Sequence, residues 1–242
     1  MTLALLDADI LCYRVGFSTE NEPEHIALVR MDNYIEEVLF GSQASEYECF
    51  LTGDNNFRKK IYPAYKHNRK NTPRPKHLQA LRQHLIDVEG AVVSDGQEAD
   101  DELGIRQTHE TIICSIDKDL LMIPGRHYNF VKQEHSTVSN AEGRYNFYRQ
   151  LLTGDTTDNI PGVYGLGPKK AADLLAGCNT KDEYNKVIMD AYTKEFPHCS
   201  DEDVKAHIQL IGQLLWIRRE EGEEWKFEMD WWTFEILHHF NY

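Results

Sequence analysis

The sequence predicts an α/β fold with a parallel sheet, followed by a helical region. Four short apolar runs, each the length of a buried strand, alternate with segments of helical periodicity over the first 140 residues. Beyond residue 140 the apolar spacing is helical. We therefore expect an α/β core over residues 1–140 and a helical region over residues 141–242, whose C-terminal tail packs on the core.

Each expected strand is a short run of apolar residues. The runs are "LALLD" (3–7), "CFLT" (49–52), "AVV" (91–93) and "TIICSI" (111–116), and "HYNFV" (127–131) has the composition of a fifth. Runs of this length between turn signals are typical of buried strands. Their alternation with helices indicates that the strands are parallel.

The expected helices carry apolar residues on one face. Asp32 can cap a helix that presents Ile35 and Val38. The segments "PKHLQALRQHLIDV" (75–88) and "EDVKAHIQLIGQLLWIRREE" (202–221) each have an apolar stripe at helical spacing. The Trp-rich segment "EEWKFEMDWWTFEIL" (223–237) fits either the core or a partner surface.

Net charge and cysteine usage limit the class of protein. The formal net charge of −14 over 242 residues argues against nucleic acid, unless acids converge on metal ions and bases cluster elsewhere. Five scattered cysteines without a C-x-x-C pair indicate reduced thiols, a cytoplasmic location and no zinc site. We expect no signal peptide and no membrane span, because leading positive charges and a run of about 18 apolar residues are both missing.

Acidic residues follow four of the expected strands. Asp7 and Asp9 follow the first strand, Asp54 the second, Glu98, Asp100 and Asp101 the third, and Asp117 and Asp119 the fourth. Because sites form at the carboxyl ends of parallel strands, these acids would meet in one crevice. Alternatively, Asp9 is only a helix cap, and Asp100 and Asp101 are first-turn acids. Clustered carboxylates stay ionised beside cations, and all-oxygen ligands favour two Mg²⁺ or Mn²⁺ ions about 4 Å apart.

Two further segments have the composition of phosphate-binding sites. In "TGDTTDNIPGVYGLGPKKAADLL" (153–175), glycines allow a close backbone approach, and a helix N-terminus with two lysines follows. The stretch "FRKKIYPAYKHNRKNTPRPKH" (57–77) interleaves bases with tyrosines. This pattern favours single-stranded nucleic acid over a merely solvated charge run, because bases of the strand can stack on the aromatic rings.

Five motifs, in this order, resemble the 5′ nuclease superfamily. They are "LLDADILCYR", "FRKKIYPAYKHNRK", "EADDELG", "SIDKDLLMI" and "TGDTTDNIPGVYGLGPKKAADLL". The chain is similar, over roughly residues 3–176, to phage 5′–3′ exonucleases, to flap endonucleases and to the 5′-nuclease domain of bacterial DNA polymerase I. The resemblance implies a PIN-like parallel sheet with an acidic metal site, followed by a helix–hairpin–helix (H3TH) region.

The resemblance assigns a role to each matching residue. It implies metal-site carboxylates at Asp7, Asp54, Glu98, Asp100, Asp101, Asp117, Asp119, Asp155 and Asp158. It implies that Lys66 and Arg69 contact the scissile phosphate at the foot of a helical arch, where they would neutralise charge during catalysis. DNA contacts are implied for Arg14, Arg58, Tyr65 as a stacking residue, and Gly162, Gly165, Gly167, Lys169 and Lys170, with K⁺ expected at the loop.

Two details of these motifs make structural predictions. On one straight helix Glu98 and Asp101 share a face, so Asp100 can turn inward only if Glu98 precedes the first turn. The connector "HNRKNTPR" (67–74) is too short for two arch helices, because an isolated helix needs about 12–15 residues. We therefore expect a basic gate over residues 66–76 that orders only when a 5′ strand enters.

Together these features predict a metal-dependent 5′–3′ exonuclease or flap endonuclease. Its substrate would be DNA with a 5′ flap, nick, gap or free 5′ end. The alternatives are a catalytically inactive structure-specific DNA-binding protein and a PIN-type ribonuclease. Retention of the acids argues against the first, and the helix–hairpin–helix loop argues against the second. We expect a freestanding monomer that works with replication proteins, in the host cytoplasm if a bacteriophage encodes it.

Overall fold

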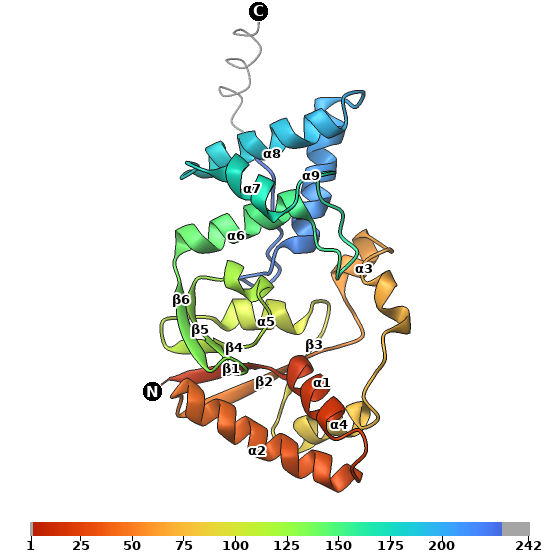
Figure 1. Ribbon diagram of the computed structural model, residues 1–242, viewed down its shortest axis with the longest axis vertical. Coiled ribbons are helices and arrows are strands. Elements are labelled where there is room, and N and C mark those ends of the chain that lie inside the picture. The colour runs from red at the N-terminus through yellow and green to blue at the C-terminus, as the bar shows by residue number, and fades with distance from the viewer. Residues whose placement is uncertain (1, 229–242) are drawn as a thin grey trace, which may run out of the picture. The chain divides into compact units, whose positions relative to one another are not determined.

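The computed structural model describes residues 2–228, which form two compact units (Figure 1). The first unit holds the chain up to Lys60, together with Lys70–Gly143 and Ile217–Glu223. The second unit holds Ile61–Arg69, Arg144–Trp216 and the chain from Glu224 on. The expected boundary at residue 140 therefore differs from these units in two segments. Residues 61–69 belong to the helical unit, and residues 217–223 belong to the α/β unit. Residues 229–237 of the Trp-rich segment lie outside the described residues.

A six-stranded sheet forms the centre of the first unit. Its strands are β1 (Leu3–Asp7), β2 (Glu46–Thr52), β3 (Val92–Ser94), β4 (Thr111–Cys114), β5 (Gly125–Asn129) and β6 (Glu134–Val138). They lie in the order β3-β2-β1-β4-β5-β6, and all pairs are parallel except β5 with β6. Strand β6 was not predicted, because four of its five residues are exposed and polar and form no apolar run.

Alternating side chains of the sheet supply two buried faces. Leu6 of β1 packs in a cluster with Leu11, Met31 and Leu81, which lie on α1 (Ala8–Ser18), α2 (Glu24–Ser42) and α4 (Leu78–Asp87). The opposite face is covered by α5 (Ala99–Arg106), whose Arg106 guanidinium lies 5.1 Å from the Phe50 ring centre. Figure 1 shows α1, α2 and α4 on one side of the sheet and α5 on the other. The sheet is thus covered on both faces, as parallel strands require.

One helix begins earlier than expected. Helix α2 begins at Glu24, so Asp32 lies inside the helix and the prediction that it is a cap was wrong. The apolar stripe of the segment 75–88 is confirmed, because Leu81 and Leu85 of α4 are fully buried. Shorter elements are α3 (Phe57–Ile61) and the 3₁₀ helices η1 (His67–Asn71) and η2 (Asp119–Met122).

The second unit is built around aromatic side chains. It contains α6 (Asn140–Thr153) from Arg144 on, α7 (Pro168–Leu175), α8 (Lys181–Glu195) and α9 (Asp201–Leu215). The Phe147 ring centre lies 4.9 Å from that of Trp216 and 5.2 Å from that of Trp225. Trp225, the first tryptophan of the Trp-rich segment, is therefore a core residue. Within residues 2–228, no helix has both the length and the apolar character needed to cross a membrane.

Candidate active site

The predicted acids follow four strands that are neighbours in the sheet. Asp7 ends β1, Asp54 follows β2, Glu98 and Asp100 follow β3, and Asp117 and Asp119 follow β4. The strands β3, β2, β1 and β4 are consecutive in the sheet, and the direction of chain winding reverses between β1 and β4. Ligands of open parallel sheets bind at such a reversal, at the carboxyl ends of the strands. The fold therefore places the acids of the first unit at the edge where a site is expected.

Ser115 connects two of these acids at the reversal point. Its hydroxyl donates to Asp7 Oδ2 at 2.6 Å and accepts from the backbone N–H of Asp117 at 3.0 Å. Asp117 Oδ1 in turn accepts the backbone N–H of Asp119 at 2.8 Å. Ser115 was not predicted from the sequence, although its place directly after β4, inside the motif "SIDKD", is the signal that could have revealed it.

The ionisation of Asp7 makes this edge suited to a cation. Burial raises the pKa of Asp7 to about 7, and the charges of Asp9 and Asp117 add to the effect although the Ser115 hydroxyl opposes it. A nearby cation would reverse the shift and keep the carboxylate ionised at neutral pH. The predicted ligands available to such an ion in this unit are carboxylate oxygens, which suit Mg²⁺ and Mn²⁺. The residues present therefore fit a divalent metal site.

Asp101 has a different role from the predicted one. The Arg58 guanidinium donates to both of its oxygens, at 2.6 and 2.9 Å, and the backbone N–H groups of Glu98 and Arg218 donate to them at 3.0 Å each. Burial alone would raise the pKa of Asp101, but these contacts outweigh it and hold the pKa below its usual value. Four donors occupy the acceptor capacity of one carboxylate, so the assignment of Asp101 as a metal ligand is corrected to a positioning residue.

Arg58 is also corrected. Its side chain is 3% exposed, so it cannot contact DNA as predicted. Its Nη1 atom lies 3.9 Å from a carboxylate oxygen of Glu98, which precedes the first residue of α5. This position of Glu98 meets the condition for Asp100 to turn inward, and Asp100 is half-buried in the first turn of α5. Arg58 and Asp101 therefore brace the turn that presents Glu98 and Asp100.

The remaining residues of this edge differ in exposure. Asp54 is exposed, and Asp119 is half-buried at the start of η2. Asp9 is not the cap of α1, a role that Asp7 fills by accepting the Ile10 N–H. Instead Asp9 pairs with Arg82 and accepts the backbone N–H of Thr52 at 2.8 Å, which anchors the end of β2.

In the second unit, Asp158 lies among the predicted catalytic bases. Lys66 Nζ lies 3.6 Å from Asp158 Oδ2, Arg69 pairs with Oδ1, and the Tyr65 hydroxyl donates to Oδ2 at 3.1 Å. The structure thus brings together four residues that the sequence singled out. Tyr65 is only 4% exposed, however, so its predicted stacking on a base is corrected: in this structure it orients Asp158.

The same segment is anchored through its backbone. The Lys66 N–H donates to the Asp158 carbonyl at 2.9 Å, and Arg69 Nε donates to the Thr157 carbonyl at 3.0 Å. Asp155 closes the loop by accepting the Thr157 N–H at 2.8 Å and by a β-bridge to Ile160. These contacts join residues 66–69 to the loop at Thr157 and Asp158. The expected gate over residues 66–76, which orders when a 5′ strand enters, stays a prediction. The expectation of no long arch helix is met, since only the short helix η1 forms over residues 67–74.

The glycine-rich loop has the backbone features that were predicted from its sequence. Gly165 has a φ of +73°, which favours glycine, and a Cβ atom on Gly162 would lie 2.2 Å from the Thr153 carbonyl carbon. Gly167 precedes the first residue of α7, where Cβ space is open. Lys169 is exposed, and Lys170 Nζ donates to the Gly165 carbonyl at 3.0 Å. The loop therefore presents a helix N-terminus and lysine charge together, as phosphate binding needs.

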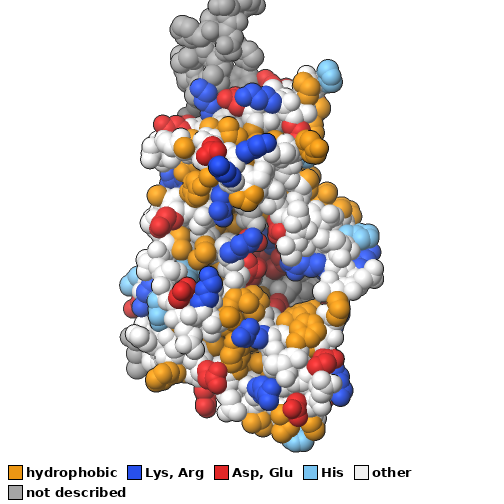
Figure 2. All heavy atoms as spheres, viewed as in Figure 1, with side chains coloured by type: hydrophobic (Ala, Val, Ile, Leu, Met, Phe, Trp, Pro, Cys, Tyr) orange, Lys and Arg blue, Asp and Glu red, His pale blue; other side chains and the backbone are white. Residues whose placement is uncertain are grey.

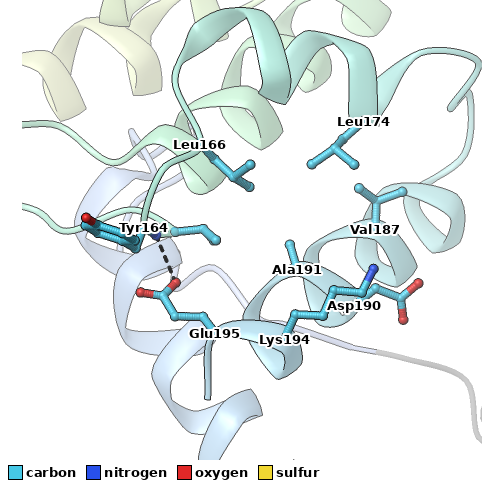
Figure 3. Close-up of a pocket in the computed structure, with 9 residues that line it drawn as sticks. Tyr164, Leu166, Leu174, Val187, Asp190, Ala191, Lys194 and Glu195 are labelled. Carbon is cyan, nitrogen blue, oxygen red and sulfur yellow. Dashed lines mark hydrogen bonds between the residues drawn. The ribbon is translucent and has the colours of Figure 1, made fainter. Parts of the chain in front are cut away.

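A groove of about 650 Å³ adjoins this loop within the second unit. Figure 3 shows Leu166, Leu174, Val187 and Ala191 directed into it, while Glu195 accepts the Tyr164 backbone N–H at 3.2 Å. Over α7 and α8, Figure 2 shows Lys and Arg side chains among hydrophobic ones. Because the groove lining is largely apolar, phosphate contacts of this region would come from the loop and its lysines.

Arg14, another predicted DNA contact, lies in the first unit. It is an exposed residue of α1, and its guanidinium carbon lies 5.8 Å from the Tyr34 ring centre on α2. Arg14 remains exposed to solvent despite this contact. Its assignment as a DNA contact stays a prediction.

The fold and the carboxylate edge define a nuclease class of α/β protein. Residues 2–148 match the family described as 5′–3′ exonuclease, N-terminal resolvase-like domain, and the chain belongs to that family. Flap endonuclease Xni of Shewanella baltica (strain OS185) is 32% identical over 190 residues, 71% of this chain and 72% of that protein. The enzyme of the same name from Shewanella woodyi is 29% identical over 195 residues, 72% of this chain and 77% of that protein. The chain is accordingly a nuclease with 5′–3′ exonuclease or flap endonuclease function.

Solved structures support the fold. The T5 D15 protein co-crystallised with metal ions superposes with a TM-score of 0.61 at 18% identity, covering 89% of this chain and 88% of that one. A T5 5′-exonuclease mutant gives 0.58 at 16% identity, covering 88% and 86%. These likenesses confirm a PIN-like sheet followed by a helical region. Both of these Shewanella relatives are bacterial proteins, so they give no support to the expected bacteriophage origin.

Proposed function

We propose that this chain hydrolyses DNA phosphodiesters near a 5′ end or a 5′ flap with the help of divalent metal ions, Mg²⁺ or Mn²⁺. The observation that carries the proposal is the Asp7–Ser115–Asp117 network at the point where the sheet order reverses. Further support comes from a similar solved structure, described as a T5 flap endonuclease in a complex with DNA and metal ions. Carboxylates at this edge would repel a phosphodiester unless cations neutralise them.

The residues of the first unit would hold the metal. Asp7 and Asp117, which the Ser115 hydroxyl fixes, are the central ligands, with Glu98, Asp100, Asp119 and Asp54 around them. Divalent ions held by these carboxylates would supply positive charge to stabilise the attacking and leaving oxygens of phosphodiester hydrolysis. Arg58 and Asp101 keep the Glu98 turn in place, so that its carboxylate does not have to reorganise during the reaction.

Lys66 and Arg69 would neutralise the charge that grows on the phosphate oxygens. Asp158 holds the Lys66 and Arg69 side chains in place before the substrate arrives. This lowers the entropic cost of ordering two long side chains when the substrate binds. The predicted role of Asp155 and Asp158 as metal ligands remains part of this proposal. We expect Asp158→Ala to reduce cleavage strongly while binding to a 5′-flap duplex stays equal or tightens, because a negative charge is removed.

The test of the proposal is metal-dependent cleavage. A 5′-flap DNA should be cut with Mg²⁺ and left intact with EDTA, and Asp117→Asn should lower the rate about 100-fold or more, since even indirect ligand partners cost 10- to 100-fold. The matched control is Asp87→Asn, an exposed residue at the end of α4, which should cleave at the native rate. Native cleavage by Asp117→Asn would remove the ligand assignment.

The same assay separates the two alternatives. A catalytically inactive DNA-binding protein would bind flap DNA tightly without cutting any 5′-ended substrate in Mg²⁺. A PIN-type ribonuclease would cut an RNA flap faster than a DNA flap of the same sequence. Preferential cleavage of the DNA flap would support the proposal against both.

Several finer features complete the proposal. K⁺ would bind at the 162–170 loop, and the enzyme would act as a monomer with replication proteins as partners. A monomer is supported by the fact that one chain supplies all the residues assigned above. A cytoplasmic location is supported by five free cysteines, of which Cys12, Cys49 and Cys114 are buried.

A further inference from the structure

Three potential metal ligands converge on the helical face of the first unit, outside the acids described above. They are Asp32 on α2, His84 on α4 and Glu89 in the turn after α4. One ligand atom of each residue lies within 4.8 Å of those of the other two. His84 Nε2 lies 2.5 Å from Asp32 Oδ1, and the Tyr47 hydroxyl donates to Glu89 Oε2.

The charges of this group are unbalanced. Two carboxylates face one imidazole, which carries at most a single positive charge. Burial raises the pKa of the Tyr47 hydroxyl. The negative charges of Glu89 and Asp32 raise it further. Burial likewise raises the pKa of the Cys49 thiol to about 12, with a contribution from Glu89. A divalent cation would neutralise the negative charge of the two carboxylates that the imidazole does not balance.

The three ligands are partly buried. The His84 side chain is 14% exposed and the Asp32 side chain 44%, while Glu89 and Tyr47 are half-buried. The group is thus open enough for an ion to enter, yet partly removed from water. Zinc bonds of about 2.0–2.2 Å to imidazole and carboxylate would require only small side-chain shifts from the present spacing.

We propose that Asp32, His84 and Glu89 form a second divalent cation site that takes Zn²⁺ or an ion of similar ligand preference. The imidazole is the discriminating ligand, because it suits Zn²⁺ while all-oxygen ligands suit Mg²⁺ and Mn²⁺. The metal would bind the lone pair of His84 Nε2, so any proton on that nitrogen would move to Nδ1 or to solvent. The expectation of no zinc site rested on ligand spacing in the sequence, which cannot reveal ligands from separate elements.

This site is distinct from the nuclease edge. Tyr47 lies near the start of β2, whereas Asp54 follows the end of that strand. At about 3.3 Å per residue, the two ends are roughly 20 Å apart. A metal here would tie α2 to α4 and to the turn before β3, so its effect would be on the stability of the first unit and not on the chemistry of cleavage.

The experiment is zinc-dependent stabilisation in the presence of saturating Mg²⁺. Protein stripped of metal with a chelator is returned to saturating Mg²⁺ and melted with and without Zn²⁺, and bound zinc is counted by equilibrium dialysis. At a Zn²⁺ concentration of 100 times Kd, the unfolding midpoint of the native chain should rise by about 5 °C or more. His84→Gln should lose this shift and bind one zinc ion fewer per chain, while retaining Mg²⁺-dependent nuclease activity.

Two controls make the result decisive. His109→Gln changes a side chain that is 91% exposed and should keep the whole shift. Asp117→Asn should also keep it, because that residue belongs to the nuclease edge. If His84→Gln does not fold, Glu89→Gln takes its place with the same expected loss. An equal shift and equal zinc count in the native chain and the His84 or Glu89 variant would overturn the proposal and leave an ion pair only.

Discussion

Removing one partner of the buried ion pair between Arg58 and Asp101 should cost more stability than removing one partner of an exposed pair among the described residues. The Asp101 side chain is fully buried, and Arg58 is 3% exposed. Asp101→Ala would remove the acceptor of two guanidinium hydrogen bonds and of the backbone N–H groups of Glu98 and Arg218. The substitution therefore tests whether Asp101 braces the active-site turn or binds metal directly.

The magnitude follows from the burial. Removing one partner of a buried ion pair costs about 3–5 kcal/mol, because the other charge remains uncompensated out of water. For a chain of this size each kcal/mol shifts the unfolding midpoint by roughly 2–4 °C, so we expect a fall of about 6–20 °C. Arg58→Met alone should cost a similar amount, and the double variant should cost less than the sum of the two.

The assay is thermal and urea unfolding monitored by circular dichroism, which give the midpoint temperature and the free energy of unfolding. Flap cleavage is measured at a temperature where each variant stays folded. Lys181→Ala, which breaks an ion pair whose side chains are 49% and 66% exposed, is the control and should change stability far less. If Asp101→Ala unfolded like the native chain but had lost cleavage, the residue would act on the metal or substrate. That result would refute the positioning role of Asp101.

Three further predictions concern other parts of the chain. Lys169→Ala with Lys170→Ala should weaken duplex binding and reduce the log–log salt slope by about 0.9 per lost phosphate contact, and an unchanged slope would show that the loop does not touch DNA. Burial lowers the pKa of His127 despite its hydrogen bond to the Ile123 carbonyl. The contribution of His127 to the free energy of unfolding is therefore complete above the unfolded pKa of about 6.5 and is lost as the pH falls below that value. His127→Gln should therefore flatten the decline of unfolding free energy between pH 7 and 5, which approaches about 1.4 kcal/mol per pH unit for one proton. Limited proteolysis should cut residues 70–76 before residues 66–69, and a first cut at Lys66 or Arg69 would contradict the anchoring by Asp158.

Much of the fold could be predicted because its signals are local. A strand such as "TIICSI" and the stripe of Leu81 and Leu85 depend on residues a few positions apart, and the periodicity of a strand or helix shows directly in such windows. The antiparallel strand β6 escaped because its polar, exposed residues pair mainly through the backbone. A strand whose side chains show no apolar alternation cannot be recognised from the sequence in this way.

The sequence by itself determined which acids follow which strands, and from these the type of chemistry and the family could be inferred. Only the tertiary structure decided the partner of each charge. Asp101 pairs with Arg58, Asp158 with Lys66 and Arg69, and Asp32 with His84. Arg58 and Asp101 are separated by 43 positions, and Asp32 and His84 by 52. An ion pair depends on distance through space and on burial, and neither quantity is set by residues within a few positions of one another.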